Sequence, residues 1–96
     1  MARRIAKRFA PHKVILFGSH ATGAAGADSD VDLLVVMPLK RTKAEQELRI
    51  RKELRAFRVP KDVVVTTPEA FESRQGVPGT VERSAAQAGR LLYESR

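Results

Sequence analysis

The chain has 96 residues, of which 43% are apolar and 5% aromatic, and it contains no cysteine. This length predicts a single small domain over residues 1–96. The absence of cysteine excludes disulfides and thiolate–metal sites. No apolar run approaches the roughly 18 residues of a membrane span. The net charge of +7 comes from basic segments at residues 1–13 and 40–61 that flank an acidic cluster at residues 28–32, so we expect an anionic ligand, an acidic protein partner or nucleic acid.

The first half of the chain alternates between helical and extended patterns. A helix is indicated where Ile5 and Phe9 share one face and Pro11 follows as a stop. Short apolar runs of β-forming residues then predict strands on either side of a segment rich in glycine and alanine. The predicted elements are a helix at residues 2–10, a strand at residues 14–17, one helical turn with a loop at residues 18–28, and a second strand at residues 31–37.

The second half continues the alternation. Thr67 followed by Pro68 is typical of a helix start, and the clearest helical spacing is the i, i+4, i+7, i+11 series Val81, Ala85, Ala88 and Leu92. The predicted elements are a helix at residues 41–57, a strand at residues 62–66, a helix start at residues 67–69, and a terminal helix at residues 79–94. This order predicts an α/β fold with a small mixed sheet of three strands, or four, flanked by helices.

The helix predicted at residues 41–57 has an incomplete apolar face. Its apolar positions fall in one arc, but Glu47, Arg51 and Arg55 interrupt that arc. We expect such a face either to pack loosely or to contact a partner. Together with the basic N-terminus it is a candidate docking surface, although an ordinary solvated helix surface explains the charges equally well.

A phosphate loop and paired carboxylates are indicated between residues 17 and 36. Gly18-Ser19 ends the first strand, ten residues follow, and Asp30-Val31-Asp32 opens the second. Two carboxylates one residue apart on a strand point to the same side, and a Gly-Ser turn before a helical turn offers free N–H groups to phosphate. The alternative is an Asp-rich loop that caps the strand. We prefer a Mg²⁺-assisted phosphoryl or nucleotidyl transfer site.

Asp62 offers a third carboxylate. It opens the third predicted strand and would converge on Asp30 and Asp32 if the second and third strands are neighbours. Taken alone, it is equally well a turn residue after Pro60. Carboxylates from two strands would hold Mg²⁺ ions, which prefer oxygen ligands and bridge substrate phosphates.

The spacing of Gly18-Ser19 and Asp30-Val31-Asp32 resembles the signature of the DNA polymerase β-like nucleotidyltransferase superfamily, and the chain is most similar to its minimal nucleotidyltransferase proteins. This resemblance implies the polymerase β-like fold. It also implies that Gly18 and Ser19 hold the nucleotide phosphates of ATP, that Asp30 and Asp32 bind Mg²⁺, and that Asp62 is the third carboxylate, which orients or deprotonates the attacking hydroxyl.

One region departs from the family pattern. Members of the family usually carry arginine directly after the Gly-Ser pair and again two residues later, where this chain has His20 and Thr22. Two bidentate, charge-assisted phosphate contacts are therefore missing. His20 could supply a partial cation or a hydrogen-bond donor in their place, or it could simply be solvated.

The resemblance also implies a partner. Minimal nucleotidyltransferases lack an acceptor domain and typically pair with a helical HEPN-type toxin, so the implied reaction is adenylylation of a tyrosine on that partner, with this chain as a cytoplasmic antitoxin. Three alternatives remain: a small-molecule nucleotidyltransferase related to aminoglycoside-modifying enzymes, for which a homodimer could build a shared pocket; a non-catalytic module that neutralises a toxin by contact; and a nucleic-acid-binding protein. The last ranks lowest because the chain lacks interleaved aromatic residues.

Overall fold

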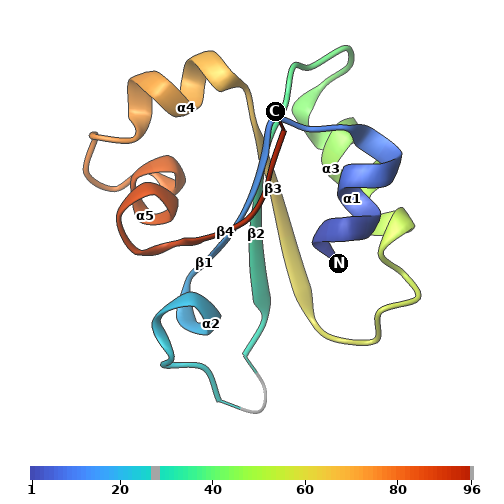
Figure 1. Cartoon of the computed structure of the whole chain (residues 1–96), viewed down its shortest axis with the longest axis horizontal. Helices are drawn as coiled ribbons and strands as arrows, with labels where there is room; N and C mark the ends of the chain where they lie inside the picture. Colours follow the sequence, from blue (N-terminus) through green and yellow to red (C-terminus); the bar gives the residue numbers. More distant parts are fainter. Residues whose placement is uncertain (27–28, 96) are drawn as a thin grey trace.

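The computed structural model describes residues 1–26 and 29–95, in which helices alternate with strands except for two consecutive helices before the last strand (Figure 1). The strands are β1 (Lys13–Phe17), β2 (Val31–Val36), β3 (Lys61–Thr66) and β4 (Arg90–Glu94). The helices are α1 (Ala2–Phe9), α2 (Ser19–Thr22), α3 (Lys43–Glu53), α4 (Pro68–Arg74) and α5 (Val81–Ala88). The first three strands agree with the predicted ones to within one residue at each end. Ala27 and Asp28, at the end of the predicted loop, lie outside the described residues.

In the described part of the chain the strands form a mixed four-stranded sheet in the order β3-β2-β1-β4. β1 pairs antiparallel with both β2 and β4, whereas β2 and β3 run parallel. The parallel pair requires a crossover, which α3 provides. The predicted α/β fold with a small mixed sheet is therefore confirmed, and the sheet has the larger of the two strand numbers considered.

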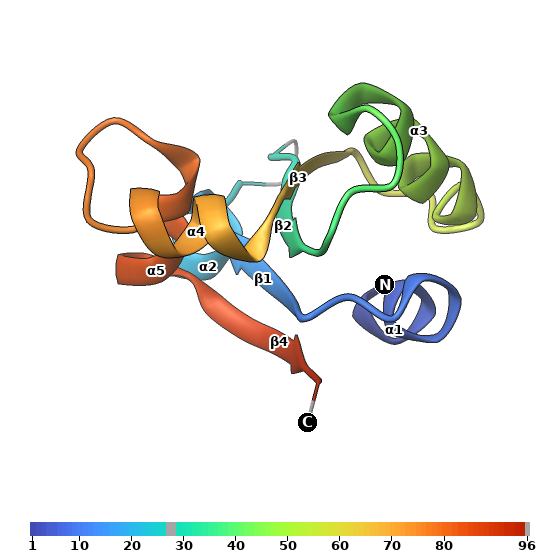
Figure 2. The same cartoon turned by 90° about the horizontal axis from the view of Figure 1, so that it is seen from above.

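Helices cover both faces of the sheet, as Figures 1 and 2 show. One core lies between the sheet and the pair α1 and α3, and includes Ile5, Leu33 and Ile50. A second core lies on the opposite face under α4 and α5, and includes Leu34 and Phe71. Consecutive residues of β2 serve opposite cores because side chains alternate across a strand. Asp32 therefore shares its face with Leu34, on the α4–α5 side of the sheet.

The terminal helix predicted at residues 79–94 is wrong in its second half. The helix ends at Ala88, and residues 90–94 form β4 against β1. Leu92, which was expected on the buried helical face, is 44% exposed. Gly89 lies at the change of direction, where a Cβ would collide with the carbonyl oxygen of Ala85. Pairing with the free edge of β1 overrides the helical periodicity, since tertiary context outweighs local propensity.

The polar residues of α3 have a structural role that the sequence did not reveal. Glu47 Oε2 accepts a hydrogen bond from the backbone N–H of Val65 at 2.9 Å, and Arg51 Nη2 donates to the carbonyl oxygen of Val63 at 3.4 Å. Both backbone groups belong to β3, which is an edge strand. The interrupted face thus closes the sheet edge, which would otherwise be open to pairing with another chain.

The helices α4 and α3 can also be compared with their predicted bounds. The predicted start of α4 is confirmed, because the Thr67 side chain accepts a hydrogen bond from the N–H of Ala70 and Pro68 begins the helix. The helix predicted at residues 41–57 is shorter and ends at Glu53. Within the described residues, none of the helices combines the length and the apolar character needed to cross a membrane.

Candidate active site

Asp32 and Asp62 lie side by side on neighbouring parallel strands. They are direct register partners in the β2–β3 ladder, so their side chains leave the sheet on the same face. Asp32 is partly buried and Asp62 is exposed. Asp30 lies immediately before β2 and is exposed. The condition set by the sequence analysis is met: the second and third strands are neighbours, and this brings the third carboxylate to the first two.

The charges of neighbouring residues act on Asp32. The pKa of Asp32 is raised above its ordinary value, first because burial disfavours the ionised carboxylate and then because the Asp62 and Asp30 carboxylates repel its charge. His20 acts in the opposite direction and lowers this pKa. The charges of Asp62, Asp30 and His20 therefore all act on the carboxylate of Asp32.

Gly18 brings the backbone against Asp32. Its neighbour Phe17 is the register partner of Asp32 across β1 and β2. Gly18 has φ 73° and ψ −154°, a conformation that is essentially restricted to glycine. A Cβ at this position would collide with Oδ2 of Asp32. The glycine is thus required both by the backbone conformation and by the space that the carboxylate occupies.

The residues after Gly18 form the single turn α2. The amides of Ala21 and Thr22 donate to the carbonyl oxygen of Gly18, while the first N–H groups of a helix have no partner within it. The Thr22 hydroxyl lies 3.4 Å from the carbonyl oxygens of both Gly18 and Ser19, so it stabilises its own turn.

His20 joins the two ends of the loop. Its Nε2 lies 3.0 Å from the carbonyl oxygen of Ser29, one residue before Asp30. Because a carbonyl only accepts, Nε2 carries the proton in this bond. His20 is therefore not simply solvated: it connects the phosphate-loop candidate to the segment that carries the carboxylates.

Asp62 has a partner that the sequence analysis did not identify. Arg51 Nη2 donates to Asp62 Oδ1 at 2.9 Å. The two residues are 11 positions apart on different elements, so no local spacing rule connects them. The only signal in the sequence was that Arg51 interrupts the apolar face of α3.

The carboxylates have the chemistry of a magnesium site without enclosing one. Among residues 1–26 and 29–95, no three His, Cys, Asp or Glu side chains are arranged to hold a metal ion. The donors are nevertheless hard oxygens. The pKa of Asp32 is raised first by burial and then by repulsion from Asp62 and Asp30, and a cation would relieve that repulsion. Mg²⁺ commonly takes only one or two carboxylates and completes its shell with water and substrate phosphates. The residues present therefore fit Mg²⁺.

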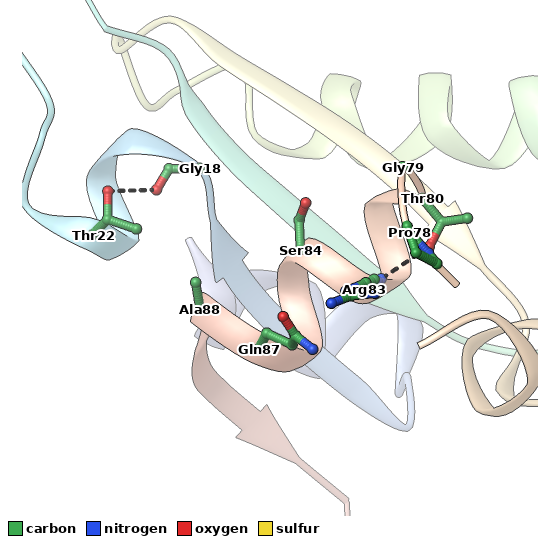
Figure 3. A pocket seen from close by; sticks show the side chains of 9 residues that line it. All are labelled: Gly18, Thr22, Pro78, Gly79, Thr80, Arg83, Ser84, Gln87 and Ala88. Atoms are coloured by element: carbon green, nitrogen blue, oxygen red, sulfur yellow. Dashed lines mark hydrogen bonds between the residues drawn. The ribbon is translucent and has the colours of Figure 1, made fainter. Parts of the chain in front are cut away.

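A hollow of about 400 Å³ adjoins Gly18. Thr22 lines it on the α2 side, and Arg83, Ser84 and Gln87 line it on the α5 side (Figure 3). Its volume is in the range of small-molecule sites. Arg83 is the one charged residue on its described wall. Sequence analysis missed it because the residues of α5 were read only for their apolar spacing.

The comparisons with known proteins agree with this geometry. The family model of the nucleotidyltransferase domain matches residues 1–91. A candidate nucleotidyltransferase from Sulfolobus solfataricus superposes with a TM-score of 0.64 at 21% identity, with 97% of this chain and 73% of that chain covered. No curated protein sequence is significantly similar to the chain.

Two toxin–antitoxin structures have the same fold. A mutant form of the MntA–HpeT pair superposes with a TM-score of 0.67 at 14% identity, and a toxin–antitoxin with AMP-PNP superposes with a TM-score of 0.59 at 16% identity. In both cases 99% of this chain and 71% of the other chain are covered. At such low identity these structures show the shared fold, whereas the family follows from the match over nearly the whole sequence. The chain belongs to the nucleotidyltransferase domain family.

Proposed function

We propose that this chain transfers AMP from ATP to a hydroxyl group, with Mg²⁺, and that the acceptor is a tyrosine of a HEPN-type toxin which the chain thereby neutralises. The observation that carries the proposal is the register pairing of Asp32 with Asp62 beside Gly18. Family membership supports nucleotidyl transfer, and the toxin–antitoxin neighbours, one of them with AMP-PNP, support the nucleotide and the type of partner.

The phosphate subsite is the turn that begins at Gly18. Gly18 keeps the backbone close to Asp32, and Ser19 starts α2, whose first N–H groups face no helical acceptor. These amides are suited to the β- and γ-phosphates of a nucleotide. His20 holds the loop closed through Ser29, so the turn keeps its shape although it lacks the arginines that are usual in the family.

The carboxylates have separate roles. Asp30 and Asp32 would hold Mg²⁺, with Asp62 nearest the acceptor. When bound, the ion supplies positive charge that stabilises the negative charge developing on the α-phosphate. Asp62 is the one carboxylate whose Oδ1 is occupied by Arg51, and this fixes the orientation of the group while Oδ2 is left to face a hydroxyl.

The reaction then needs one bond made and one broken. The acceptor oxygen attacks the α-phosphorus, and the bond from that phosphorus to the bridging oxygen of the β-phosphate breaks, releasing pyrophosphate. The hydroxyl proton passes to Oδ2 of Asp62. A positioned carboxylate base of this kind contributes about 10²- to 10⁴-fold in rate.

The direct test incubates the chain with α-labelled ATP, Mg²⁺ and the helical partner. Label should appear on the partner and should be lost in Asp30→Asn and Asp32→Asn, while the exposed carboxylate variant Glu72→Gln should transfer normally. Mapping the labelled residue identifies the hydroxyl. If no label transfers with any nucleotide or divalent ion, the enzymatic proposal fails.

One observation favours a second candidate, neutralisation by contact alone. In the described loop, His20 and Thr22 bond to backbone carbonyls of the loop itself, so neither side chain is committed to phosphate. Under this reading, Asp30→Asn and Asp32→Asn should protect cells from the toxin as well as the parent chain does. Under the enzymatic proposal both variants should lose protection.

A further inference from the structure

A second hollow lies at the opposite end of β2 from Asp32. Its volume is about 490 Å³, and it is bounded by the end of α1, the segment after β2 and the first turns of α3. Met37, which lines this hollow, lies five positions after Asp32, and on an extended strand this corresponds to roughly 17 Å. The hollow is thus separate from the candidate active site.

The wall of this hollow is strongly cationic. Arg8, Lys40, Arg41 and Arg49 line it, and no acidic residue is among its lining residues. Arg8 is paired with Glu53 at 3.3 Å, whereas the other three form no ion pair within the described part of the chain. Three uncompensated cations around one concavity attract an anion. The guanidinium groups of Arg41 and Arg49 are suited to bidentate phosphate contacts.

Gln46 provides the second observation. It lines the hollow and is only 6% exposed, yet its side-chain amide forms no hydrogen bond with any residue that the structure describes. Among the described residues, no buried side-chain nitrogen or oxygen lacks a hydrogen-bond partner, so the atoms of this amide reach the solvent of the hollow, where a ligand can bond to them. The amide can both donate and accept.

The remaining lining favours a compact ligand over a strand of nucleic acid. Phe9 and Met37 form an apolar floor, and the volume is in the range typical of small-molecule pockets. Binding of single strands relies on successive aromatic platforms, and here Phe9 is the one aromatic residue on the described wall.

We propose that this hollow is a second ligand site, which binds a phosphorylated small molecule of the nucleotide class. Lys40, Arg41 and Arg49 contact its phosphates, Gln46 hydrogen-bonds the polar edge of its base, and Phe9 and Met37 contact the base or sugar. The site does not depend on the proposed nucleotidyl transfer, because it shares no residue with the phosphate turn or the carboxylates.

The test is a titration of the isotopically labelled chain with ADP in EDTA, followed by amide NMR. We expect the Gln46 side-chain amide and the backbone amides of Arg41 and Arg49 to shift together along one saturating curve. The curve for the Ser19 amide reports separately on the phosphate turn, so failure at one site is distinguishable from failure at the other.

Variants fix the assignment. Arg41→Gln with Arg49→Gln should weaken binding at Gln46 by about tenfold or more, while Arg55→Gln with Arg58→Gln, which removes the same charge from exposed positions outside the hollow, should leave it within about twofold. Gln46→Leu should weaken ADP several-fold and leave pyrophosphate binding unchanged.

Three results would overturn the proposal. The first is the absence of a saturable shift at Gln46, and the second is an equal weakening of ADP binding by the two double-arginine variants. The third is binding of oligonucleotides with an affinity that rises with their length and that both double-arginine variants reduce equally. The last two would show general attraction of polyanions to a basic surface. A retained melting temperature in each variant shows that the fold is intact.

Discussion

Arg51 on α3 and Asp62 on β3 form an ion pair with an Nη2–Oδ1 distance of 2.9 Å. The same guanidinium lies 3.4 Å from the carbonyl oxygen of Val63, so the arginine is fixed to the strand at two points. Their side chains are 45% and 51% exposed, and exposed ion pairs contribute little to stability, about 0–1 kcal/mol. The pair therefore acts mainly on the orientation of the carboxylate.

The Arg51–Asp62 pair predicts a difference between two variants. Asp62→Asn should reduce transfer to the acceptor by about 10²-fold or more, because it removes the proposed base. Arg51→Gln should reduce it by no more than about tenfold, because the base is retained but less well oriented. Both should keep the free energy of unfolding within about 1 kcal/mol of the parent. Single-turnover transfer and urea denaturation measure these quantities.

Arg55→Gln is the matched control, since it removes an exposed guanidinium from the segment just after α3. A loss in Arg51→Gln as large as that in Asp62→Asn would mean that Arg51 itself contacts the substrate. Unfolding of Asp62→Asn would make Asp62 a structural residue and remove it from the proposed mechanism.

Gly18 can be tested against Gly23, which also has a positive φ but open space around it. Gly23→Ala should destabilise the fold by about 1–2 kcal/mol, the penalty of a left-handed conformation. Gly18→Ala carries a similar backbone penalty and, in addition, places a Cβ against Oδ2 of Asp32. We expect it to unfold at lower denaturant than Gly23→Ala and to lose nucleotide affinity, which isothermal titration measures. Equal stability and affinity in the two variants would contradict the close approach.

Asp32 predicts a pH dependence of stability. Its pKa is raised in the folded state, chiefly by burial and then by Asp62 and Asp30, so the folded chain binds this proton more tightly than the unfolded chain. The stabilisation is fully present below the unfolded value, near 3.8, and is lost as the pH rises through the higher folded value. At pH 7 the ionised Asp32 destabilises the fold.

Asp32→Asn should therefore melt at a higher temperature than the parent at pH 7, and the difference should shrink as the pH approaches 4. Mg²⁺ should raise the melting temperature of the parent more than that of the variant, because the ion relieves the same repulsion. Thermal denaturation over this pH range, with and without Mg²⁺, measures both effects. A variant less stable than the parent at pH 7 would show that the carboxylate is stabilising.

Sequence reasoning located the carboxylates because strand periodicity is local. Asp30 and Asp32 lie next to a buried strand whose alternation can be read directly, and Gly18 precedes them at a recognisable spacing. The meeting of Asp62 with Asp32 needed one further fact, the neighbourhood of β2 and β3, which the sequence allowed without requiring. Their direct register pairing is a second fact, which the structure supplies.

Contacts between elements that are distant in the chain could not be predicted from local sequence patterns. The role of Glu47 and Arg51 depends on which strand lies at the sheet edge, so their interruption of an apolar face was ambiguous. The same is true of the cationic hollow, which Arg8 of α1 and Arg49 of α3 line together. Residues 90–94 have a helical apolar period but form an edge strand, because β1 offers a free partner.

The end of α5 allows a test in which the sign of the effect decides between the helical prediction and the structure. In a helix through residues 79–94, Gly89→Ala would stabilise the chain by about 1 kcal/mol, the difference in helix propensity. In the structure, a Cβ at Gly89 meets the Ala85 carbonyl oxygen and lies 2.7 Å from Cγ2 of Ile15. Because Ile15 is buried and neither neighbour is the end of a flexible side chain, the backbone of β4 must shift away from β1. We expect a loss of about 1–3 kcal/mol, as for an overpacked core.

Gly76→Ala is the control, because a Cβ there meets nothing within 4 Å and its φ is not in the left-handed region. It should be neutral or stabilise by up to about 1 kcal/mol through the unfolded chain. Urea denaturation gives both values, and amide exchange of Leu91 and Tyr93 reports on β4 itself. Because β4 pairs with the strand that leads into Gly18, its displacement should also weaken nucleotide binding. A stabilised Gly89→Ala with unchanged exchange in residues 90–94 would refute the strand.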